Sequence, residues 1–452
     1  MADANGDDMS LLLLNANSLH IPLADRSVHC CVTSPPYWGL RDYGISNQLG
    51  LEAVPDCLGW ATHAPCGECY ICHTVAWARE VKRVLRDDGT FWLNLGDTYA
   101  GSWGSMSYPG GSIAARRFGG DNQENVGRPV NSRLSGNLKP KDLCGIPWRV
   151  ALALQADGWY LRSDIIWSKP NPMPESVTDR PTKAHEYLFL LAKSERYYYD
   201  ADAVRETMSE ATKERDRNGF NGAFKGQFRG TPGEERWQDG RPISEPHFYN
   251  GAGRNHRTVW SIATAPYSGA HFATYPPALV EPCIKAGTSE RGCCPKCGKG
   301  WKRVVEDGFK AHDGNTYTKY PDGWDTEPGA HGTVHRKGRS NGTAAKRLAL
   351  LRQAARENGG EYSNTRSTTG WSPACTHAAE PVPCTVLDPF AGSGTTLMVA
   401  RQLGRNAVGL DLSLPYLRDQ ARSRLSLSQL EAWTNGRNVE VIDLGPLFDE
   451  VA

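Results

Sequence analysis

Two short segments of the chain combine glycine, proline and reactive side chains in spacings that suit chemistry on a bound ligand. One reads Asp388-Pro-Phe-Ala-Gly-Ser-Gly-Thr-Thr396, and the other reads Thr33-Ser-Pro-Pro-Tyr37. Glycines let the backbone approach a ligand closely, and a helix that begins after them offers free N–H groups. Two prolines fix the backbone, so that carbonyl groups and the Ser34 hydroxyl can be directed at an amino group while Tyr37 stacks on a planar ring. Neither segment has the Gly-Lys-Ser/Thr of an NTPase phosphate loop.

A second acidic residue strengthens the first of these motifs. We expect a strand at 385–388, a helix at 395–403 and a strand at 407–411, so that Asp411 ends the strand after the glycine-rich turn. An acid at that place can accept hydrogen bonds from ribose hydroxyls, as in nucleotide-binding α/β folds. A Gly-x-Gly turn alone would also fit an ordinary strand–helix connection, and a proline-rich turn alone would be equally ordinary. The combination favours a nucleotide-like cofactor.

The elements that would position these motifs alternate between strand and helix. Strands are expected at 11–14, 28–33, 90–95, 160–167 and 185–192, and helices at 73–85, 147–156, 273–286 and 415–427. This alternation predicts an α/β fold with a doubly wound, mostly parallel sheet, in which ligands bind at the carboxyl ends of the strands. Regular patterns are missing from 207–257 and from 300–370, apart from a helix-like patch at 343–357.

Composition limits the class of protein. The 452 residues are 39% hydrophobic, with 47 glycines and 29 prolines, which is typical of a globular core interrupted by polar loops and excludes a coiled coil or a collagen. No apolar run approaches the ~20 residues of a membrane span, and the acidic first residues do not resemble a signal peptide. We therefore expect a cytoplasmic protein. The net charge is +1, but residues 100–141 and 331–370 are basic; they suit phosphate contacts or solvated loops equally well.

The thirteen cysteines are clustered in a way that suggests metal ligands. Two sets have the spacing of closed, four-ligand structural zinc sites, which leave no position for a substrate. Cys293 could substitute in one set, and His63 or His73 in the other; unliganded thiols are the alternative for both. The proposed ligands are Cys294, Cys297, Cys375 and His377 for one zinc, and Cys57, Cys66, Cys69 and Cys72 for the other.

Together, Ser-Pro-Pro-Tyr and Asp-Pro-Phe-Ala-Gly-Ser-Gly-Thr resemble the motifs of amino-group DNA methyltransferases. The catalytic motif comes early and the cofactor motif late, which is similar to the permuted beta group of that family. Residues 159–172 and 186–191 are also similar to it, and the resemblance covers most of 10–290 and 384–427. It implies a Rossmann-like methyltransferase fold in permuted order, with S-adenosylmethionine as the methyl donor.

The resemblance also assigns roles to individual residues. Ser34, Pro35, Pro36 and Tyr37 would act on an exocyclic amino group of a base flipped out of the duplex and stacked on Tyr37, with Trp38 as a second candidate wall. Thr274 or Tyr275 would touch the cofactor carboxylate. The residues expected to line the cofactor are Asn17, Asp388, Phe390, Gly392, Gly394, Thr395, Thr396 and Asp411.

Two amino groups remain candidates for methylation: N4 of cytosine and N6 of adenine. A serine before Pro-Pro-Tyr is commoner in the enzymes that methylate N4 of cytosine, so N4-cytosine is favoured over N6-adenine. Carbon-5 methylation is rejected, because Pro282-Cys283 follows Glu124-Asn125-Val126 in the reverse of the required order. A catalytically inactive, zinc-containing DNA-binding protein is a further alternative, as is an RNA or protein-glutamine methyltransferase.

This interpretation divides the chain into parts and names its partners. Double-stranded DNA is the expected substrate, a cognate restriction endonuclease is a candidate partner, no membrane is involved, and the coding source is a bacterium or a phage. The recognition sequence and the oligomeric state do not follow from the residues. The expected parts are a catalytic half at 10–206 with a Cys-rich insertion at 57–73, a target-recognition region at 207–260, a cofactor-binding half at 261–292 and 384–430, and a zinc-knuckle insertion with a basic loop at 293–383.

Overall fold

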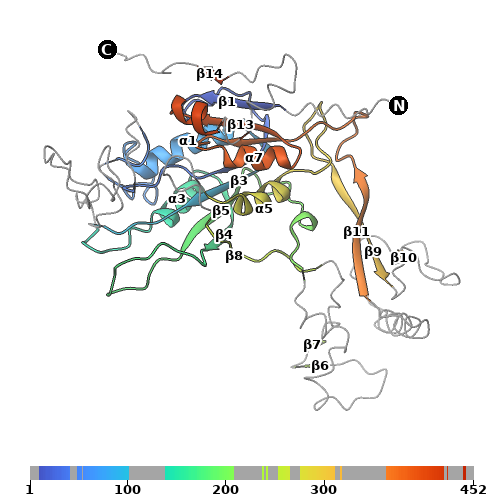
Figure 1. Ribbon diagram of the computed structural model, residues 1–452, viewed down its shortest axis with the longest axis horizontal. Helices are drawn as coiled ribbons and strands as arrows, with labels where there is room; N and C mark the ends of the chain where they lie inside the picture. The colour runs from blue at the N-terminus through green and yellow to red at the C-terminus, as the bar shows by residue number, and fades with distance from the viewer. Residues whose placement is uncertain are drawn as a thin grey trace. The chain divides into compact units, whose positions relative to one another are not determined.

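The computed structural model of the chain describes residues 10–40, 48–52, 54–100, 138–207, 237–238, 241–242, 253–264, 275–310, 316–317, 363–421, 425 and 441–443 (Figure 1). The chain forms two compact units. The first comprises 1–203, 257–302 and 373–452, and the second comprises 204–256 and 303–372. Among the described residues, no helix has the length and apolar character needed to cross a membrane.

The first unit is built on a nine-stranded sheet. Among its described strands, only β5 runs against the common direction, since it pairs antiparallel with both of its neighbours. The sheet is therefore mixed α/β and mostly parallel, as the alternating pattern predicted. Its order is β14 (Val441–Asp443), β1 (Leu11–Asn15), β13 (Asn406–Asp411), β12 (Thr385–Asp388), β2 (Val28–Thr33), β3 (Leu85–Leu95), β5 (His185–Ala192), β4 (Tyr160–Ser168) and β8 (Val259–Ser261).

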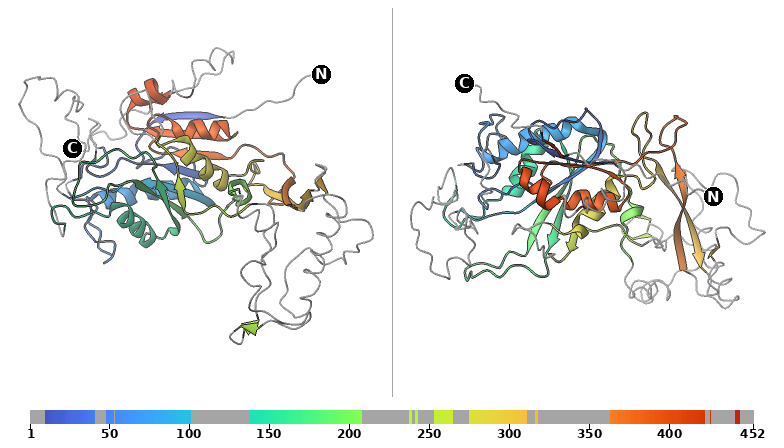
Figure 2. Two further views of the ribbon diagram at one scale, coloured as in Figure 1. Left: turned by 60° about the horizontal axis from the view of Figure 1, so that its bottom comes forward. Right: turned by 45° about the horizontal axis from the view of Figure 1, so that its top comes forward.

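Two helix pairs cover opposite faces of this sheet (Figure 2). Helices α1 (Tyr70–Val84) and α3 (Ile146–Ala156) contact each other, as do α5 (Pro277–Gly287) and α7 (Thr395–Gln402). Neighbouring residues of a strand point to opposite faces. Cys31 of β2 belongs to the core that α1 closes, whereas the thiol of Cys30 lies against the backbone of Cys283 in α5. The sheet is thus doubly wound.

The central pairing of the sheet joins chain segments that are far apart in sequence. Strand β12 lies beside β2, with Val386 opposite Cys30 and Leu387 opposite Cys31. Strand β2 is almost wholly buried, which suits its Val-His-Cys-Cys-Val-Thr sequence, and it ends because Pro35 and Pro36 cannot continue a central ladder. As a result, the segments that follow β2 and β12 leave the same edge of the sheet.

Most predicted elements are present with small shifts in their ends. Strand β3 begins at Leu85 rather than at residue 90, and α5 begins at Pro277, where a proline suits the first helical turn. The helix predicted at 415–427 is present over its described part, where the backbone at Tyr416–Ala421 (η3) is π-helical.

The prediction of irregular structure over 300–370 is wrong for part of the second unit. Strands β10 (Thr316–Tyr317), β9 (Lys302–Lys310) and β11 (Ser363–Ser372) form a sheet, and Arg303 lies 4.4 Å from the ring centre of Trp371. Strand β11 reads Ser-Asn-Thr-Arg-Ser-Thr-Thr-Gly-Trp-Ser, so it lacks the apolar alternation that would have revealed it. The helix-like patch at 343–357 lies outside the described residues. So does most of the 207–260 region, apart from pieces that include β6 (Trp237–Gln238) and β7 (Arg241–Pro242).

Candidate functional site

The two sequence motifs meet at the carboxyl edge of the sheet. The Thr33 hydroxyl, at the end of β2, donates a hydrogen bond of 2.6 Å to Oδ1 of Asp388, at the end of β12. Ser34 follows Thr33 directly, and the glycine-rich turn follows Asp388. The catalytic and cofactor motifs are therefore neighbours in space, although 355 residues separate the two bonded side chains.

Asp388 is the buried centre of this junction, with 1% of its surface exposed. Its Oδ1 also accepts the Phe390 backbone N–H at 3.1 Å, and its Oδ2 accepts the Tyr275 hydroxyl at 2.9 Å. Burial raises the pKa of Asp388, and these hydrogen bonds oppose that rise. The hydroxyl of Thr396 contacts that of Tyr275 and donates to the carbonyl of Val32 at 3.2 Å. Asp388, Thr396 and Tyr275 thus hold the edge together through hydrogen bonds within the protein.

The glycine-rich turn has the backbone geometry that only glycine adopts without strain. Gly392 has a φ of 49° and Gly394 a φ of 79°, and Gly394 caps the start of α7. A side-chain carbon added at Gly392 would have no heavy atom nearer than 4.0 Å, so that side of the turn is open to a ligand. The Phe390 ring instead packs edge-on against Trp77 at 4.9 Å, which supports the turn from within the protein.

Asp411 lies at the end of β13, next to this turn. Its Oδ2 accepts the Gly392 N–H at 2.9 Å, and its Oδ1 accepts the Ser413 N–H at 2.8 Å. Burial raises the pKa of Asp411 to about 6 despite these two bonds. Each carboxylate oxygen keeps a lone pair for a ligand hydroxyl. Asn17 lies just beyond the end of β1, and its side chain closes a local turn by accepting the Leu19 N–H at 2.9 Å.

The catalytic motif is held by polar groups that the sequence analysis did not single out. The Ser34 hydroxyl donates to the Tyr37 oxygen at 3.1 Å, and the Tyr37 hydroxyl donates to Oε2 of Glu186 at 2.8 Å. The Asn94 amide also reaches Ser34, Tyr37 and Glu186, at 3.3, 2.6 and 2.9 Å. Lys169 pairs with the other oxygen of Glu186. Lys169 lies in 159–172 and Glu186 in 186–191, the two further segments that resemble the family. That resemblance was the sequence signal that could have marked these two residues.

Two details of the Ser-Pro-Pro-Tyr loop bear on the predicted wall for a flipped base. The Tyr37 ring rests on the backbone of Gly96, where an added side-chain carbon would come within 2.6 Å of Cε2. The prediction that Trp38 forms a second wall for the base is wrong, because its side chain is buried. Trp38 is 3% exposed, and its indole N–H donates to the carbonyl of Glu52 at 2.8 Å. The Pro36 carbonyl accepts the Tyr70 hydroxyl at 3.0 Å, which fastens the loop to α1.

A family of DNA methylases that comprises N6 and N4 methyltransferases matches residues 28–295 and 381–422, well over half of the chain. The chain belongs to this DNA methylase family. The prediction of an amino-methylating DNA methyltransferase is thereby confirmed.

Curated relatives agree with this family. The type II methyltransferase M.Cfr9I of Citrobacter freundii is 45% identical over 266 residues, which are 59% of this chain and 68% of that protein. M.SmaI of Serratia marcescens is 41% identical over 281 residues, covering 61% of this chain and 75% of that protein. Among solved structures, the PvuII DNA methyltransferase, described as cytosine-N4-specific, covers 91% of this chain and 86% of its own at 13% identity and a TM-score of 0.42. That likeness is too low to carry a conclusion.

The first cysteine set of the methylase comes together at the start of α1. The sulfur atoms of Cys57, Cys66, Cys69 and Cys72 all lie within 4.8 Å of one another. Backbone N–H groups of Glu68 and Cys69 point at the Cys66 sulfur, each at 3.3 Å. Partial burial alone would raise the pKa of Cys66, but these N–H groups lower it to about 7. The set fits a metal that binds thiolates. His73 is not part of it, because its Nδ1 pairs with Glu52 at 2.9 Å.

The second set is also assembled. Single donor atoms of Cys294, Cys297, Cys375 and His377 lie within 4.8 Å of one another, with the Cys294 sulfur 3.6 Å from Nδ1 of His377. Burial would raise the pKa of Cys294, but backbone N–H groups lower it to about 6. This turn is attached to the sheet, since Arg86 donates to the Cys297 carbonyl at 2.8 Å.

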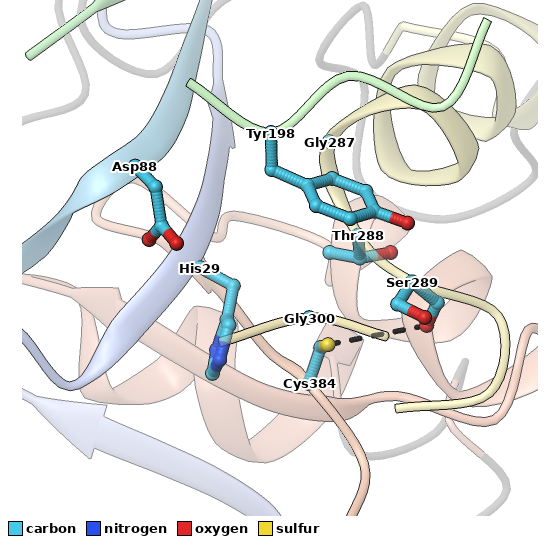
Figure 3. A pocket seen from close by; sticks show the side chains of 8 residues that line it. All are labelled: His29, Asp88, Tyr198, Gly287, Thr288, Ser289, Gly300 and Cys384. Carbon is cyan, nitrogen blue, oxygen red and sulfur yellow. Dashed lines mark hydrogen bonds between the residues drawn. The ribbon is translucent and has the colours of Figure 1, made fainter. Parts of the chain in front are cut away.

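A third group of close donor atoms comprises His29, Cys293 and Cys384. His29 and Cys384 line a small pocket at the amino end of β2 (Figure 3). Both ring nitrogens of His29 are occupied: Nδ1 accepts the Thr385 N–H at 3.0 Å, and Nε2 lies 2.9 Å from the Gly298 carbonyl. A metal would have to displace one of these bonds, so the group does not fit a metal site. Cys293, the alternative ligand, is grouped with His29 and Cys384, and the second set has four donor atoms without it.

Replacing Thr33 by valine should destabilise the methylase by about 1–3 kcal/mol, because it leaves the buried carboxylate of Asp388 short of a hydrogen-bond donor. Unfolding in urea measures the change. Thr74→Val is the matched control: the Thr74 hydroxyl is equally buried and has no hydrogen-bond partner in the described part of the chain, so its loss should be neutral or stabilising. Equal effects of the two substitutions would contradict the role given to the Thr33–Asp388 bond.

Proposed function

We propose that the chain transfers a methyl group from S-adenosylmethionine to the exocyclic amino group of a base flipped out of double-stranded DNA, with N4 of cytosine favoured. The observation that carries the proposal is the Thr33–Asp388 hydrogen bond, because it joins Ser34 to the glycine-rich turn. N6 of adenine is the alternative. The choice of cytosine rests on Ser34, which stands before Pro-Pro-Tyr where an acidic or amide residue is commoner in the adenine enzymes.

The cofactor residues proposed from the sequence fall into two groups. Gly392 and Gly394 offer an open turn at the start of α7, and Asp411 offers lone pairs to the two ribose hydroxyls. Asn17 lies at the same edge, because β1 pairs with β13 up to Asn15 and Asp411. Asp388, Phe390 and Thr396 support this turn through their contacts inside the protein. Thr395, the remaining proposed residue, is buried in the first turn of α7.

The chemistry proposed for the catalytic loop is one of orientation. The cofactor supplies an electrophilic methyl carbon on a sulfonium centre. A ring amino group is a poor nucleophile, because its lone pair is delocalised into the ring. Ser34 and the Pro35 carbonyl would accept its hydrogens, which moves electron density back to nitrogen and directs the lone pair at the methyl carbon. Tyr37 would contact the flipped base, and Pro36 would hold the loop on α1.

We further propose the parts and partners of the enzyme. The catalytic half (10–206) precedes the cofactor-binding half (261–292 and 384–430), which is the permuted order of the beta group. Target recognition is assigned to 207–260. M.Cfr9I and M.SmaI are named type II methyltransferases, which supports a cognate restriction endonuclease as a partner. The absence of a spanning helix in the described residues fits a cytoplasmic enzyme.

Both cysteine sets are proposed to hold structural zinc. Four ligand atoms within 4.8 Å of one another suit a tetrahedral ion, and thiolates stabilised by backbone N–H groups suit zinc. The second ion would hold together the two ends of the 293–383 insertion, since Cys294 and Cys375 lie on either side of the basic loop and both belong to the first unit. Neither ion is assigned a part in the reaction.

Purified protein should produce N4-methylcytosine in unmodified plasmid DNA, detected by mass spectrometry of the nucleosides. Ser34→Ala should lower the rate by about 10²–10³-fold, because it removes an acceptor from the amino group, and should leave cofactor binding intact. Ser27→Ala is the control, since the Ser27 hydroxyl only bonds the Ala24 carbonyl in a surface turn. N6-methyladenine as the product would select the alternative base, and no methylated nucleoside at all would refute the proposal.

Cofactor affinity should depend on pH through Asp411. The ionised carboxylate accepts two ribose hydroxyls, so affinity should be low below pH 6, rise as pH passes through the pKa of about 6, and level off above pH 7. Below the pKa of Asp411, the affinity for S-adenosylmethionine should fall by about tenfold for each pH unit. Calorimetry with S-adenosylmethionine measures it. Asp411→Asn should bind weakly at every pH; if this variant kept the wild-type pH profile, another group would be responsible.

Purified protein should contain up to two zinc ions per chain by elemental analysis. Cys66→Ser and Cys294→Ser should each remove one, because each loses a ligand from a different set. Cys384→Ser should retain the wild-type content, since the group around His29 does not fit a metal. Unchanged zinc in both ligand variants would show that the two cysteine sets are free thiols.

A further inference from the structure

A carboxylate that the proposed chemistry does not use lies at the catalytic edge. Glu186 is the second residue of β5, and because β5 is the reversed strand, its first residues lie where the parallel strands end. Its side chain is 17% exposed, and that of its partner Lys169 is 18% exposed. Lys169 also lies 4.3 Å from the ring centre of Trp167, which limits its movement. Removing two charges from water costs about as much free energy as their attraction returns, so stability alone does not explain this buried pair.

The charge of Glu186 fixes the direction of the hydrogen bonds around it. Burial alone would raise the pKa of Glu186, but Lys169 and the hydrogen bonds from Asn94 and Tyr37 lower it, so the carboxylate is ionised and only accepts. The Tyr37 hydrogen must then point at Glu186. Burial, with Glu186 beside it, raises the pKa of Tyr37 well above its usual value, so this hydroxyl keeps its proton.

The direction of the Tyr37–Glu186 hydrogen bond also determines the direction of the hydrogen bond between Tyr37 and Ser34. Because the Tyr37 hydroxyl donates its hydrogen to Glu186, the Tyr37 oxygen can only accept from Ser34, whose hydroxyl donates to it at 3.1 Å. The Asn94 amide nitrogen has two hydrogens and lies 2.6 Å from the Tyr37 oxygen, 2.9 Å from Oε2 of Glu186 and 3.3 Å from the Ser34 oxygen. The Ser34 oxygen therefore keeps at least one lone pair and has no hydrogen to offer. That is the arrangement needed to accept a hydrogen from an amino group.

We propose that Glu186, held by Lys169, is a positioning residue that makes Ser34 a pure hydrogen-bond acceptor toward the target amino group, acting through the hydroxyl of Tyr37. This inference rests on the proposed function. In a Glu186→Gln variant, the carboxamide oxygen faces Lys169 and the NH₂ group faces Tyr37. The Tyr37 hydroxyl then donates to Ser34, and the Ser34 hydrogen points at the lone pair that should attack the methyl carbon.

A double-mutant cycle on the single-turnover rate of methyl transfer to plasmid DNA tests the proposal. Glu186→Gln and Tyr37→Phe should each lower the rate by about 10²-fold, and the double variant should lose no more than either single one, because both break the same chain of bonds. The dissociation constant for S-adenosylmethionine should stay within about twofold of wild type, since neither residue lies at the glycine-rich turn. Additive losses in the cycle would mean that Glu186 acts independently of Tyr37, and the proposal would be wrong.

Two comparisons keep the outcome decisive. Glu80→Gln removes a carboxylate of similar exposure that pairs with Arg83 at 2.8 Å on α1, away from Ser34, and should leave the rate within about twofold. If Glu186→Gln does not fold, Tyr37→Phe alone decides, because it changes no buried charge: a rate within twofold of wild type overturns the proposal. A wild-type protein that transfers no methyl group contradicts the proposed function itself, whereas an active wild type with an equally active Tyr37→Phe contradicts only the role of Glu186.

Discussion

The hydrogen bond between Thr33 and Asp388 is the interaction on which the rest of the catalytic edge depends. Both residues are almost completely buried, and a buried carboxylate is costly unless its oxygens find donors. Those donors come from both motifs: Thr33 from the end of β2, the Phe390 N–H from the glycine-rich turn, and the hydroxyl of Tyr275. Separating the two motifs would remove the Thr33 donor and leave this buried carboxylate one hydrogen bond short. The spacing between the catalytic and cofactor loops is therefore fixed by a polar contact inside the sheet.

The single reversed strand gives this edge a second set of polar groups. In a fully parallel sheet, the residues that begin a strand lie at the edge opposite the ligand. Strand β5 runs the other way, so its first residues, including Glu186, lie beside the ends of β3 and β4. Asn94 lies in β3, and Lys169 directly follows β4. One reversal thus brings a carboxylate, an amide and an ammonium group to the catalytic loop, and these groups determine which way its hydroxyls point.

Sequence patterns predicted most of the first unit, because its buried strands are short, apolar and bounded by glycine or proline. They also predicted both motifs and both cysteine sets, which are local in sequence or distinctive in type. They missed Glu186 and Asn94, since a single polar residue in an apolar strand does not reveal which groups it bonds, and the family resemblance of 186–191 marked the segment but not the role of Glu186. They missed β11, where threonine and serine replace the apolar alternation. They also failed for Trp38, because nothing in the chain reveals that its indole N–H reaches the carbonyl of Glu52.

The two cysteine sets stand in different relations to the catalytic loop. The second is tied to the beginning of β2, where His29 contacts the Gly298 carbonyl, and β2 rises about 13 Å from His29 to Thr33 at ~3.3 Å per residue. A metal at that end can only support the fold. In the first set, Cys69 and Cys72 flank the first turn of α1, from which the Tyr70 hydroxyl holds the Pro36 carbonyl. A metal there would fix the start of α1 and, through Tyr70, the loop that carries Ser34. Loss of this metal would therefore lower the rate of methyl transfer, although the metal does not contact the substrate.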